Sequence, residues 1–130
     1  MPYDLKGRNV LITGGSRGLG ALIAEKFAVE GCNVAINYVS SEERAKETAK
    51  QSIAAGDGKI KAVTIQGDMG VQADIVRTVK ESISQLGGLD IIISNAGWTK
   101  FSDFGDLSAL TEEEWDKASY FLIYPSRLVN

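Results

Sequence analysis

The residues best suited to binding chemistry form one glycine-rich segment near the N-terminus. Thr13–Gly20 reads TGGSRGLG and lies between a short apolar run and a helical pattern. Glycines allow a tight turn and a close approach of the backbone to a ligand. A helix N-terminus offers free N–H groups and a favourable dipole to a phosphate, so the segment predicts a site for a dinucleotide pyrophosphate. The residues that we expect to contact it are Gly14, Ser16, Arg17, Gly18, Leu19 and Gly20.

Two other glycine-rich motifs do not fit this segment. Gly15 and Gly20 have the spacing of a P-loop, but Ala21 and Leu22 stand where Lys and then Ser or Thr are required. The strict G-x-G-x-x-G fingerprint fails because Ile23 stands where its third glycine would be. The remaining alternative is a strand-to-helix turn with a purely structural role.

Composition excludes several other kinds of chemistry. The 130 residues contain no histidine and one cysteine, Cys32, which excludes Ser-His-Asp catalysis, histidine-based metal sites and an intrachain disulfide. The 14 Lys plus Arg against 17 Asp plus Glu give a net charge of −3, which disfavours a nucleic-acid partner. The apolar runs are too short to cross a membrane, and the N-terminus lacks a signal-peptide pattern. The expected location is therefore the cytoplasm, with no membrane partner and no metal.

The elements that must position the glycine-rich turn alternate along the chain. Short apolar runs predict strands at residues 10–12, 34–36, 60–65 and 89–93. Helical patterns cover residues 18–30, 41–55 and 74–86, and a weaker one covers 111–117. This alternation predicts one α/β domain, a doubly wound parallel sheet with helices on its faces.

Two of the predicted helices carry an apolar stripe that should face the sheet. In the helix at 18–30 the stripe consists of Leu19, Ile23 and Phe27, and Gly31 fits the position just after the helix end. In the helix at 74–86 the stripe consists of Ile75, Val79, Ile83 and Leu86. In the helix at 41–55, Ser41 is the expected cap.

Four features in this order resemble the classical short-chain dehydrogenases/reductases. They are the pattern T-G-x-x-x-G-x-G from Thr13, Asp68 after the third strand, Asn95-Ala96-Gly97 after the fourth, and the sheet pattern between them. The resemblance runs from about Leu5 to Lys117, and Ala35–Tyr38 followed by Ser40–Glu43 is most similar to 3-oxoacyl-acyl-carrier-protein reductase-like ketoreductases. It implies a Rossmann-type sheet of strand order 3-2-1-4 and hydride transfer between NADP(H) and a small carbonyl or alcohol.

The choice between NADP and NAD depends on the end of the second strand. NAD sites place an Asp or Glu there, which accepts a hydrogen bond from the ribose 2′-hydroxyl. Here Asn37, Tyr38 and Val39 include no carboxylate, while Arg17 and the hydroxyl of Ser40 can donate to a 2′-phosphate. NADP(H) is therefore favoured over NAD(H), with Asn37, Tyr38 and Ser40 among the contacts and Ser41 as a further donor.

The resemblance assigns the remaining cofactor positions. It implies that Asp68 accepts from the adenine amino group and that the N–H of Met69 meets the ring, although such an Asp can also be a helix N-cap. It implies that Asn95 stabilises the centre of the sheet and that Ala96 and Gly97 pass close to the cofactor. Ser94 departs from the family, which commonly has a first Asn there. Trp98 and Phe101 are expected to be lid or core residues.

No catalytic residue is predicted within the chain. The family uses a Tyr-x-x-x-Lys pair with a Ser, and none of the four tyrosines is followed four residues later by a lysine. We expect residues 1–117 to form an incomplete, truncated cofactor-binding domain and residues 118–130 to be a divergent tail. Residues 89–93 would then form an exposed apolar edge, with marginal stability, weak cofactor binding and an incomplete oligomer interface. The alternatives to an oxidoreductase are a non-catalytic NADP(H)-binding module and an inactive splicing or gene-model product.

Overall fold

Four parallel strands and three covering helices form the structure, a computed structural model that describes residues 3–97 and 111–117. The element order is β1 (Asn9–Ile12), α1 (Gly18–Val29), β2 (Asn33–Tyr38), α2 (Glu42–Ala55), β3 (Ala62–Gln66), α3 (Gln72–Leu86) and β4 (Ile91–Ile93). Residues 112–117 are also helical, and the hydroxyl of Thr111 accepts the N–H of Glu114 at their start. Trp98, Phe101 and residues 118–130, for which the sequence also gives predictions, lie outside the described residues.

The sheet has the strand order β3-β2-β1-β4, and every pairing is parallel. Leu11 of β1 is in register with Ala35 of β2 and with Ile92 of β4. The predicted Rossmann-type sheet and its order 3-2-1-4 are confirmed. Because the strands are parallel, the turns that follow β1, β2, β3 and β4 all lie at one edge of the sheet. Within the described residues β4 is an edge strand, and its three isoleucines are partly exposed.

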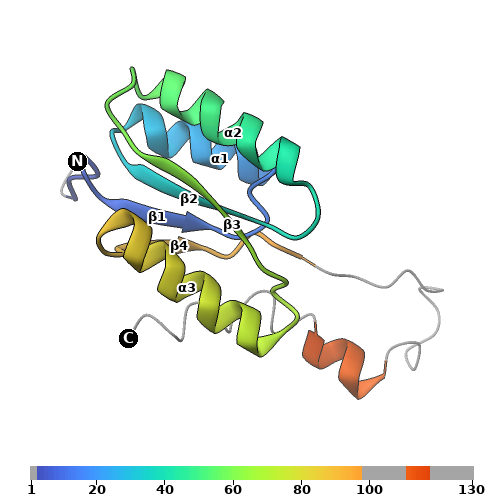
Figure 1. Cartoon of the computed structure of the whole chain (residues 1–130). Coiled ribbons are helices and arrows are strands. Elements are labelled where there is room, and N and C mark those ends of the chain that lie inside the picture. Colours follow the sequence, from blue (N-terminus) through green and yellow to red (C-terminus); the bar gives the residue numbers. More distant parts are fainter. Residues whose placement is uncertain (1–2, 98–110, 118–130) are drawn as a thin grey trace.

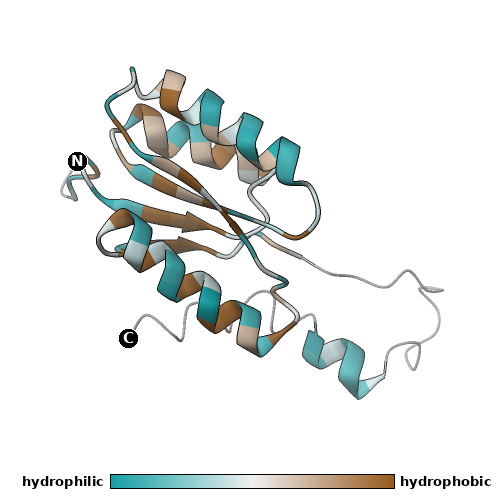
Figure 2. Cartoon of the chain, viewed as in Figure 1, coloured by the Kyte–Doolittle hydropathy of each residue, from teal (hydrophilic) through white to brown (hydrophobic). Residues whose placement is uncertain are grey.

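Helices cover both faces of the sheet: α1 and α2 lie side by side on one face and α3 lies on the other (Figure 1). Alternate residues of β1 and β2 point to opposite faces, so each face has its own core. Val10, Ile12, Val34 and Ile36 pack on the side of α1 and α2, whereas Leu11 packs on the side of α3. The strands are accordingly hydrophobic, while hydrophilic residues dominate the outer faces of the helices (Figure 2).

The predicted buried stripe of α1 is wrong by one position. Its buried residues are Gly20, Ala24 and Ala28, whereas Leu19 is 65% exposed. The reason is that small residues let α1 approach the sheet and α2 closely, and the larger Ile23 and Phe27 are only partly buried beside them. The helix ends at Val29 with Glu30 as its C-cap, and Gly31 occupies the expected position just after it, with a φ of +88° that suits glycine.

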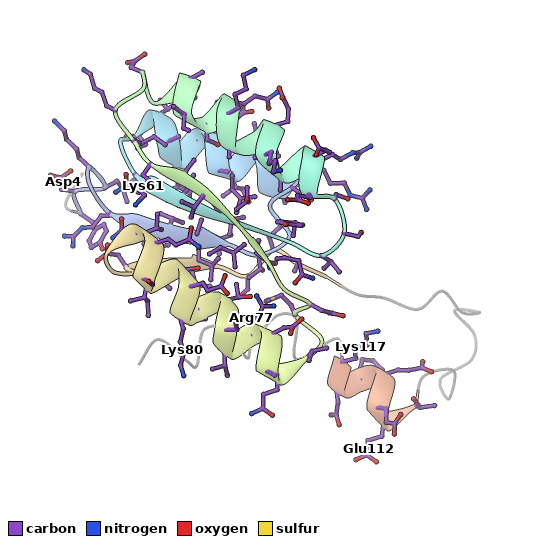
Figure 3. The ribbon with its side chains drawn as sticks, viewed as in Figure 1. Asp4, Lys61, Arg77, Lys80, Glu112 and Lys117 are labelled. Carbon is purple, nitrogen blue, oxygen red and sulfur yellow. The ribbon has the colours of Figure 1, made fainter. Side chains whose placement is uncertain are left out.

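In α3 the predicted stripe is partly correct. Ile75 and Val79 are buried and Leu86 packs against the core, but Ile83 is 43% exposed. Ser82 takes the buried place beside Val79, and its hydroxyl donates to the carbonyl of Thr78 at 2.8 Å. The charged side chains of Lys80 and Glu112 point into solvent (Figure 3).

No helix within residues 3–97 and 111–117 is long and apolar enough to cross a membrane. The same part of the chain contains no group of three or more Cys, Asp or Glu side chains arranged to hold a metal ion.

Candidate cofactor site

A cleft of about 370 Å³ lies at the carboxyl ends of β1, β2 and β4. It brings together three segments that are distant in the sequence: the glycine-rich turn, the turn after β2 and the segment after β4. Its lining residues are Gly14, Ser16, Arg17, Gly18, Tyr38, Val39, Ser40, Ser41, Asn95, Ala96 and Gly97. The predicted site residues that do not line it are Leu19, Gly20, Asn37, Asp68 and Met69.

The glycine-rich turn directs its N–H groups and its carbonyl groups differently. The carbonyls of Thr13 and Gly14 accept from the side-chain amide of Asn95, and the carbonyl of Ser16 accepts from the hydroxyl of Thr48. In contrast, the N–H groups of residues 16–20 have no partner among the described residues. Free N–H groups at the start of α1, with the nearby carbonyls engaged elsewhere, form an anion-binding geometry.

At two glycines of this segment, a Cβ atom would lie less than 3.0 Å from its neighbours. Gly14 has a φ of +62°, which is strained for other residues, and a Cβ there would lie 2.9 Å from the Cα of Ala96. Gly20 has ordinary φ, but a Cβ would lie 2.5 Å from the carbonyl oxygen of Gly14 and 2.6 Å from the Nδ2 of Asn95. The start of α1 therefore packs directly on the turn and on the segment after β4. Gly20 therefore contributes to the site by leaving space for the carbonyl of Gly14 and the side-chain amide of Asn95.

Asn37 does not line the cleft, but its side chain holds the glycine-rich turn that does. Asn37 is fully buried, so it supports the site from inside the protein, and its direct contact with the cofactor stays a prediction. Its Oδ1 accepts the N–H of Gly14 at 3.1 Å, and its Nδ2 donates to the carbonyls of Ile65 and Gly67 at 3.3 and 3.0 Å. One side chain thus ties the turn after β1 to the end of β3.

Asn95 ties the segment after β4 to the same turn. Its main-chain N–H donates to the Thr13 hydroxyl at 3.0 Å, and the N–H of Ala96 donates to that hydroxyl at 3.0 Å. Together with the side-chain bonds of Asn95 to Thr13 and Gly14, these contacts link the segments that follow β1 and β4 at the carboxyl ends of the strands.

Arg17 is the one charged residue among the described residues that line the cleft. It is exposed, has extended backbone at the position before α1, and its side chain has no hydrogen bond or ion pair with any described residue. Across the cleft are Tyr38, Ser40 and Ser41. Ser41 is the N-cap residue of α2, as predicted, but its side chain makes no capping hydrogen bond and so remains available.

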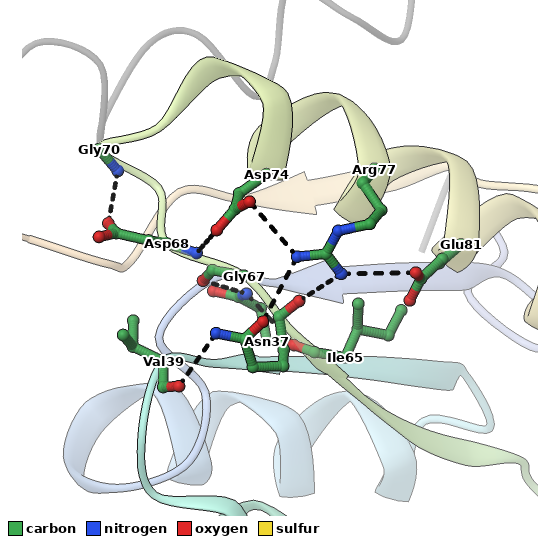
Figure 4. A network of polar contacts seen from close by, with 10 residues as sticks. Asn37, Val39, Ile65, Gly67, Asp68, Gly70, Asp74, Arg77 and Glu81 are labelled. Carbon is green, nitrogen blue, oxygen red and sulfur yellow. Dashed lines mark hydrogen bonds and ion pairs between the residues drawn. The ribbon is translucent and has the colours of Figure 1, made fainter.

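Asp68 lies in a separate polar network at the end of β3 (Figure 4). Its carboxylate accepts the N–H of Gly70 at 2.8 Å, and its own N–H donates to Oδ2 of Asp74 at 2.9 Å. The N-cap interpretation of Asp68 is wrong, because α3 begins after Val71 and Asp68 instead closes a local turn. Met69 is 1% exposed as a whole residue, so a contact of its N–H with the adenine ring stays a prediction.

Arg77 of α3 completes this network. Its guanidinium donates to the carbonyl of Gln66 at 2.8 Å and lies 3.5 Å from Asp74 and 3.4 Å from Glu81 (Figure 4). Neither Thr48 nor the pair Asp74–Arg77 is among the residues predicted from the sequence. A signal existed for Asp74, since an acidic residue in the first turn of a helix favours contacts with free N–H groups. No local pattern marked Thr48.

Comparison with known proteins decides between a general nucleotide fold and a particular family. A family model described as "short chain dehydrogenase" matches residues 8–120. The chain belongs to the short-chain dehydrogenase family. The resemblance inferred from the glycine-rich turn, Asp68 and Asn95 is thereby confirmed.

Curated members of the short-chain dehydrogenase family match most of this chain. A short chain dehydrogenase of Claviceps purpurea is 38% identical over 117 residues, which are 90% of this chain and 42% of the relative. The 3-oxoacyl-acyl-carrier-protein reductase FabG of Staphylococcus epidermidis is 36% identical over 109 residues, which are 84% of this chain and 42% of that enzyme. The chain thus spans less than half the length of these relatives.

Solved structures with 28–33% identity to this chain share its fold. A short chain dehydrogenase from Burkholderia cenocepacia, solved in complex with NADP, has a TM-score of 0.80 and 33% identity, covering 98% of this chain and 49% of its own. A blue fluorescent protein from a metagenomic library, solved in complex with NADPH, has a TM-score of 0.80 and 28% identity, covering 98% of this chain and 50% of its own.

Proposed function

We propose that this chain binds NADP(H) in the cleft at the carboxyl ends of β1, β2 and β4. The observation that carries the proposal is the glycine-rich turn, whose N–H groups at residues 16–20 are free while its carbonyls are engaged by Asn95 and Thr48. This geometry fits a pyrophosphate. The NADP and NADPH complexes of the similar structures support the choice of cofactor.

The 2′-phosphate of NADP(H) would lie between Arg17 and the turn after β2. An anion entering the cleft meets the unpaired guanidinium of Arg17, the hydroxyls of Ser40 and Ser41, and no lining carboxylate. Charge-assisted hydrogen bonds from a guanidinium suit a phosphate. These contacts favour NADP(H) over NAD(H).

The other site residues take the places that the family resemblance implies. Asp68 and the N–H of Met69 would meet the adenine, and the backbone of Ala96 and Gly97 would approach the nicotinamide half of the cofactor. Asn37, Asn95 and Gly20 shape the turn. Residues 1–117 are the proposed cofactor-binding unit.

The whole protein is proposed to be an oxidoreductase. Bound NADP(H) supplies or accepts a hydride, and family membership supports a carbonyl or alcohol substrate. The Tyr-x-x-x-Lys pair of the family does not occur within these 130 residues. We therefore assign cofactor binding, and no catalytic role, to the residues of this chain. This absence favours a second candidate function for the 130 residues alone, an NADP(H)-binding module without turnover.

Titration with NADPH and with NADH, followed by nicotinamide fluorescence, tests the cofactor assignment. We expect tighter binding of NADPH, and a rise in melting temperature when it is present. Arg17→Ala should weaken NADPH binding about tenfold and leave NADH binding within about twofold, since a hydrogen bond to a charged group contributes about 1.5–3 kcal/mol.

Lys59→Ala is the matched control, because it removes one exposed positive charge at the opposite edge of the sheet. It should change neither affinity. Equal affinities for NADPH and NADH would refute the 2′-phosphate assignment, and no binding of either would refute the cofactor proposal. Reduction of a carbonyl substrate by the 130-residue chain with NADPH would exclude the module without turnover.

A further inference from the structure

Thr48 makes a hydrogen bond that is unusual for its place in a helix. It lies in the middle of α2, where a threonine hydroxyl commonly bonds the carbonyl four residues earlier in its own helix. Here Oγ1 donates instead to the carbonyl of Ser16 at 3.0 Å, across 32 residues of sequence. Thr48 is 3% exposed, so the donor end of this bond is buried, while the acceptor Ser16 is partly exposed at the cleft.

Small residues on both helices make this bond possible. The buried faces carry Gly20, Ala24 and Ala28 on α1 and Ala45 and Ala49 on α2. Helices with such faces can approach closely, and α1 and α2 lie side by side (Figure 1). The short side chain of Thr48 therefore reaches the turn that precedes α1.

The bond connects the two walls of the cleft. Ser16 precedes Arg17 in one wall, whereas Thr48 belongs to α2, whose first turn follows Tyr38, Ser40 and Ser41 of the other wall. The tethers from Asn37 and Asn95 act on Thr13 and Gly14, at the beginning of the turn. Among the described residues, Thr48 supplies the side-chain tether at the Arg17 end.

We propose that Thr48 is a positioning residue that fixes the distance between Arg17 and the turn after β2, and thereby the preference for a 2′-phosphorylated nucleotide. The inference rests on the proposed function. A 2′-phosphate needs donors from both walls at once, whereas the pyrophosphate needs only the N–H groups of the glycine-rich turn. Loss of the hydrogen bond that connects the two walls should therefore weaken NADPH binding more than NADH binding.

Three variants test this role by titration with NADPH and NADH. Thr48→Val keeps the shape of the side chain and removes the donor, Thr48→Ser keeps the donor, and Thr78→Val removes a buried hydroxyl that has no partner. We expect Thr48→Val to raise the Kd of NADPH about fivefold, as for loss of one hydrogen bond, and that of NADH less than twofold. Thr48→Ser and Thr78→Val should keep the preference of the wild type.

Trypsin gives a readout without cofactor, because Arg17 is exposed in the turn itself. Cleavage after Arg17 follows the population of the locally opened turn, so Thr48→Val should speed it about fivefold. Thr48→Ser and Thr78→Val should leave this rate near that of the wild type.

If the wild type prefers NADPH and the Thr48→Val variant keeps the whole preference, the role of Thr48 is overturned and the proposed function stands. An equal loss of preference in Thr78→Val would overturn this role too, by showing a general effect of buried hydroxyls. A wild type that binds neither nucleotide would overturn the proposed function and this role together.

Discussion

The Oδ1 atom of Asn37 accepts the N–H of Gly14 at 3.1 Å, and this bond joins the end of β2 to the glycine-rich turn from inside the protein. The side chain is fully buried and also donates to the carbonyls of Ile65 and Gly67. A residue that the sequence assigned to the cofactor is thus a support of the loop that the cofactor would touch.

Replacing Asn37 by Leu should be costly, because the N–H of Gly14 and the carbonyls of Ile65 and Gly67 all lose their hydrogen bonds to its side chain. We expect a loss of about 3 kcal/mol in the free energy of unfolding, measured by urea denaturation. Asn33→Leu is the control on the same strand: Asn33 is partly exposed and bonds Asn9 and Lys61. It should lose about 1 kcal/mol. Equal losses would contradict the structural role of Asn37.

Gly20→Ala should destabilise the protein, although Ala normally favours a helix over Gly by about 1 kcal/mol. The added Cβ has no space beside the carbonyl of Gly14 and the amide of Asn95, so we expect a net loss of about 2 kcal/mol in thermal unfolding. Gly97→Ala meets nothing within 4 Å and should stay within about 0.5 kcal/mol of the wild type. A stabilised Gly20→Ala variant would show that α1 does not pack on the turn as described.

The network at the end of β3 predicts an order of effects. Asp74→Ala leaves the N–H of Asp68 without its acceptor and should cost about 2 kcal/mol, while Asp74→Asn keeps an acceptor and should cost less than about 1 kcal/mol. Arg77→Ala removes ion pairs of a side chain that is 41% exposed, so its cost should also stay near 1 kcal/mol. Urea denaturation of the three variants measures this order. A larger loss for Arg77→Ala than for Asp74→Ala would contradict it.

Cys32 predicts a loss of stability at alkaline pH. Burial, and then the charges of Glu30 and Asp90, raise the pKa of its thiol above the ordinary value of 9.0. The folded state therefore holds the proton more tightly than the unfolded state. This contribution is complete below pH 9 and is lost as the pH rises through the higher folded pKa.

The comparison with Cys32→Ala isolates this contribution from other titrating groups. The difference in unfolding free energy between the wild type and the variant should be constant from pH 7 to about pH 8 and shrink above pH 9. Urea denaturation across this range measures it. A constant difference up to pH 10.5 would mean that the thiol titrates alike in both states.

The strands were predictable because parallel strands buried on both faces have compact apolar runs, whereas their order was implied by the resemblance to the short-chain dehydrogenases/reductases. The runs at Val10–Ile12 and Val34–Ile36 therefore mark β1 and β2 directly. The stripe of α1 was misassigned because the prediction followed the large residues, such as Leu19, whereas close packing buried Gly20 and Ala24 instead. The spacing of apolar residues in α1 fits two adjacent faces of the helix, one with large residues and one with small residues. The spacing alone does not show which of these faces packs against the sheet.

The glycine-rich turn, Arg17 and the segment after β4 were predictable as lining of one cleft, because chain order and parallel strands place them at one edge of the sheet. The supports of the turn were not. The bonds from Thr48 to Ser16 and from Asn95 to Gly14 join residues far apart in sequence, and they depend on how closely the helices and strands pack. Their residue types alone carry no sign of such partners.

The three tethers of the turn set the moment at which a phosphate site can exist during synthesis. The turn leaves the ribosome early, but its supports at Asn37, Thr48 and Asn95 follow it by 23, 32 and 81 residues. In a nascent chain that has not yet placed β4 beside β1, the carbonyls of Thr13 and Gly14 still lack the side-chain amide of Asn95. Nucleotide binding would thus require that the four strands are already paired. A nucleotide present during synthesis would stabilise chains in which β4 lies beside β1 and would not stabilise shorter nascent chains.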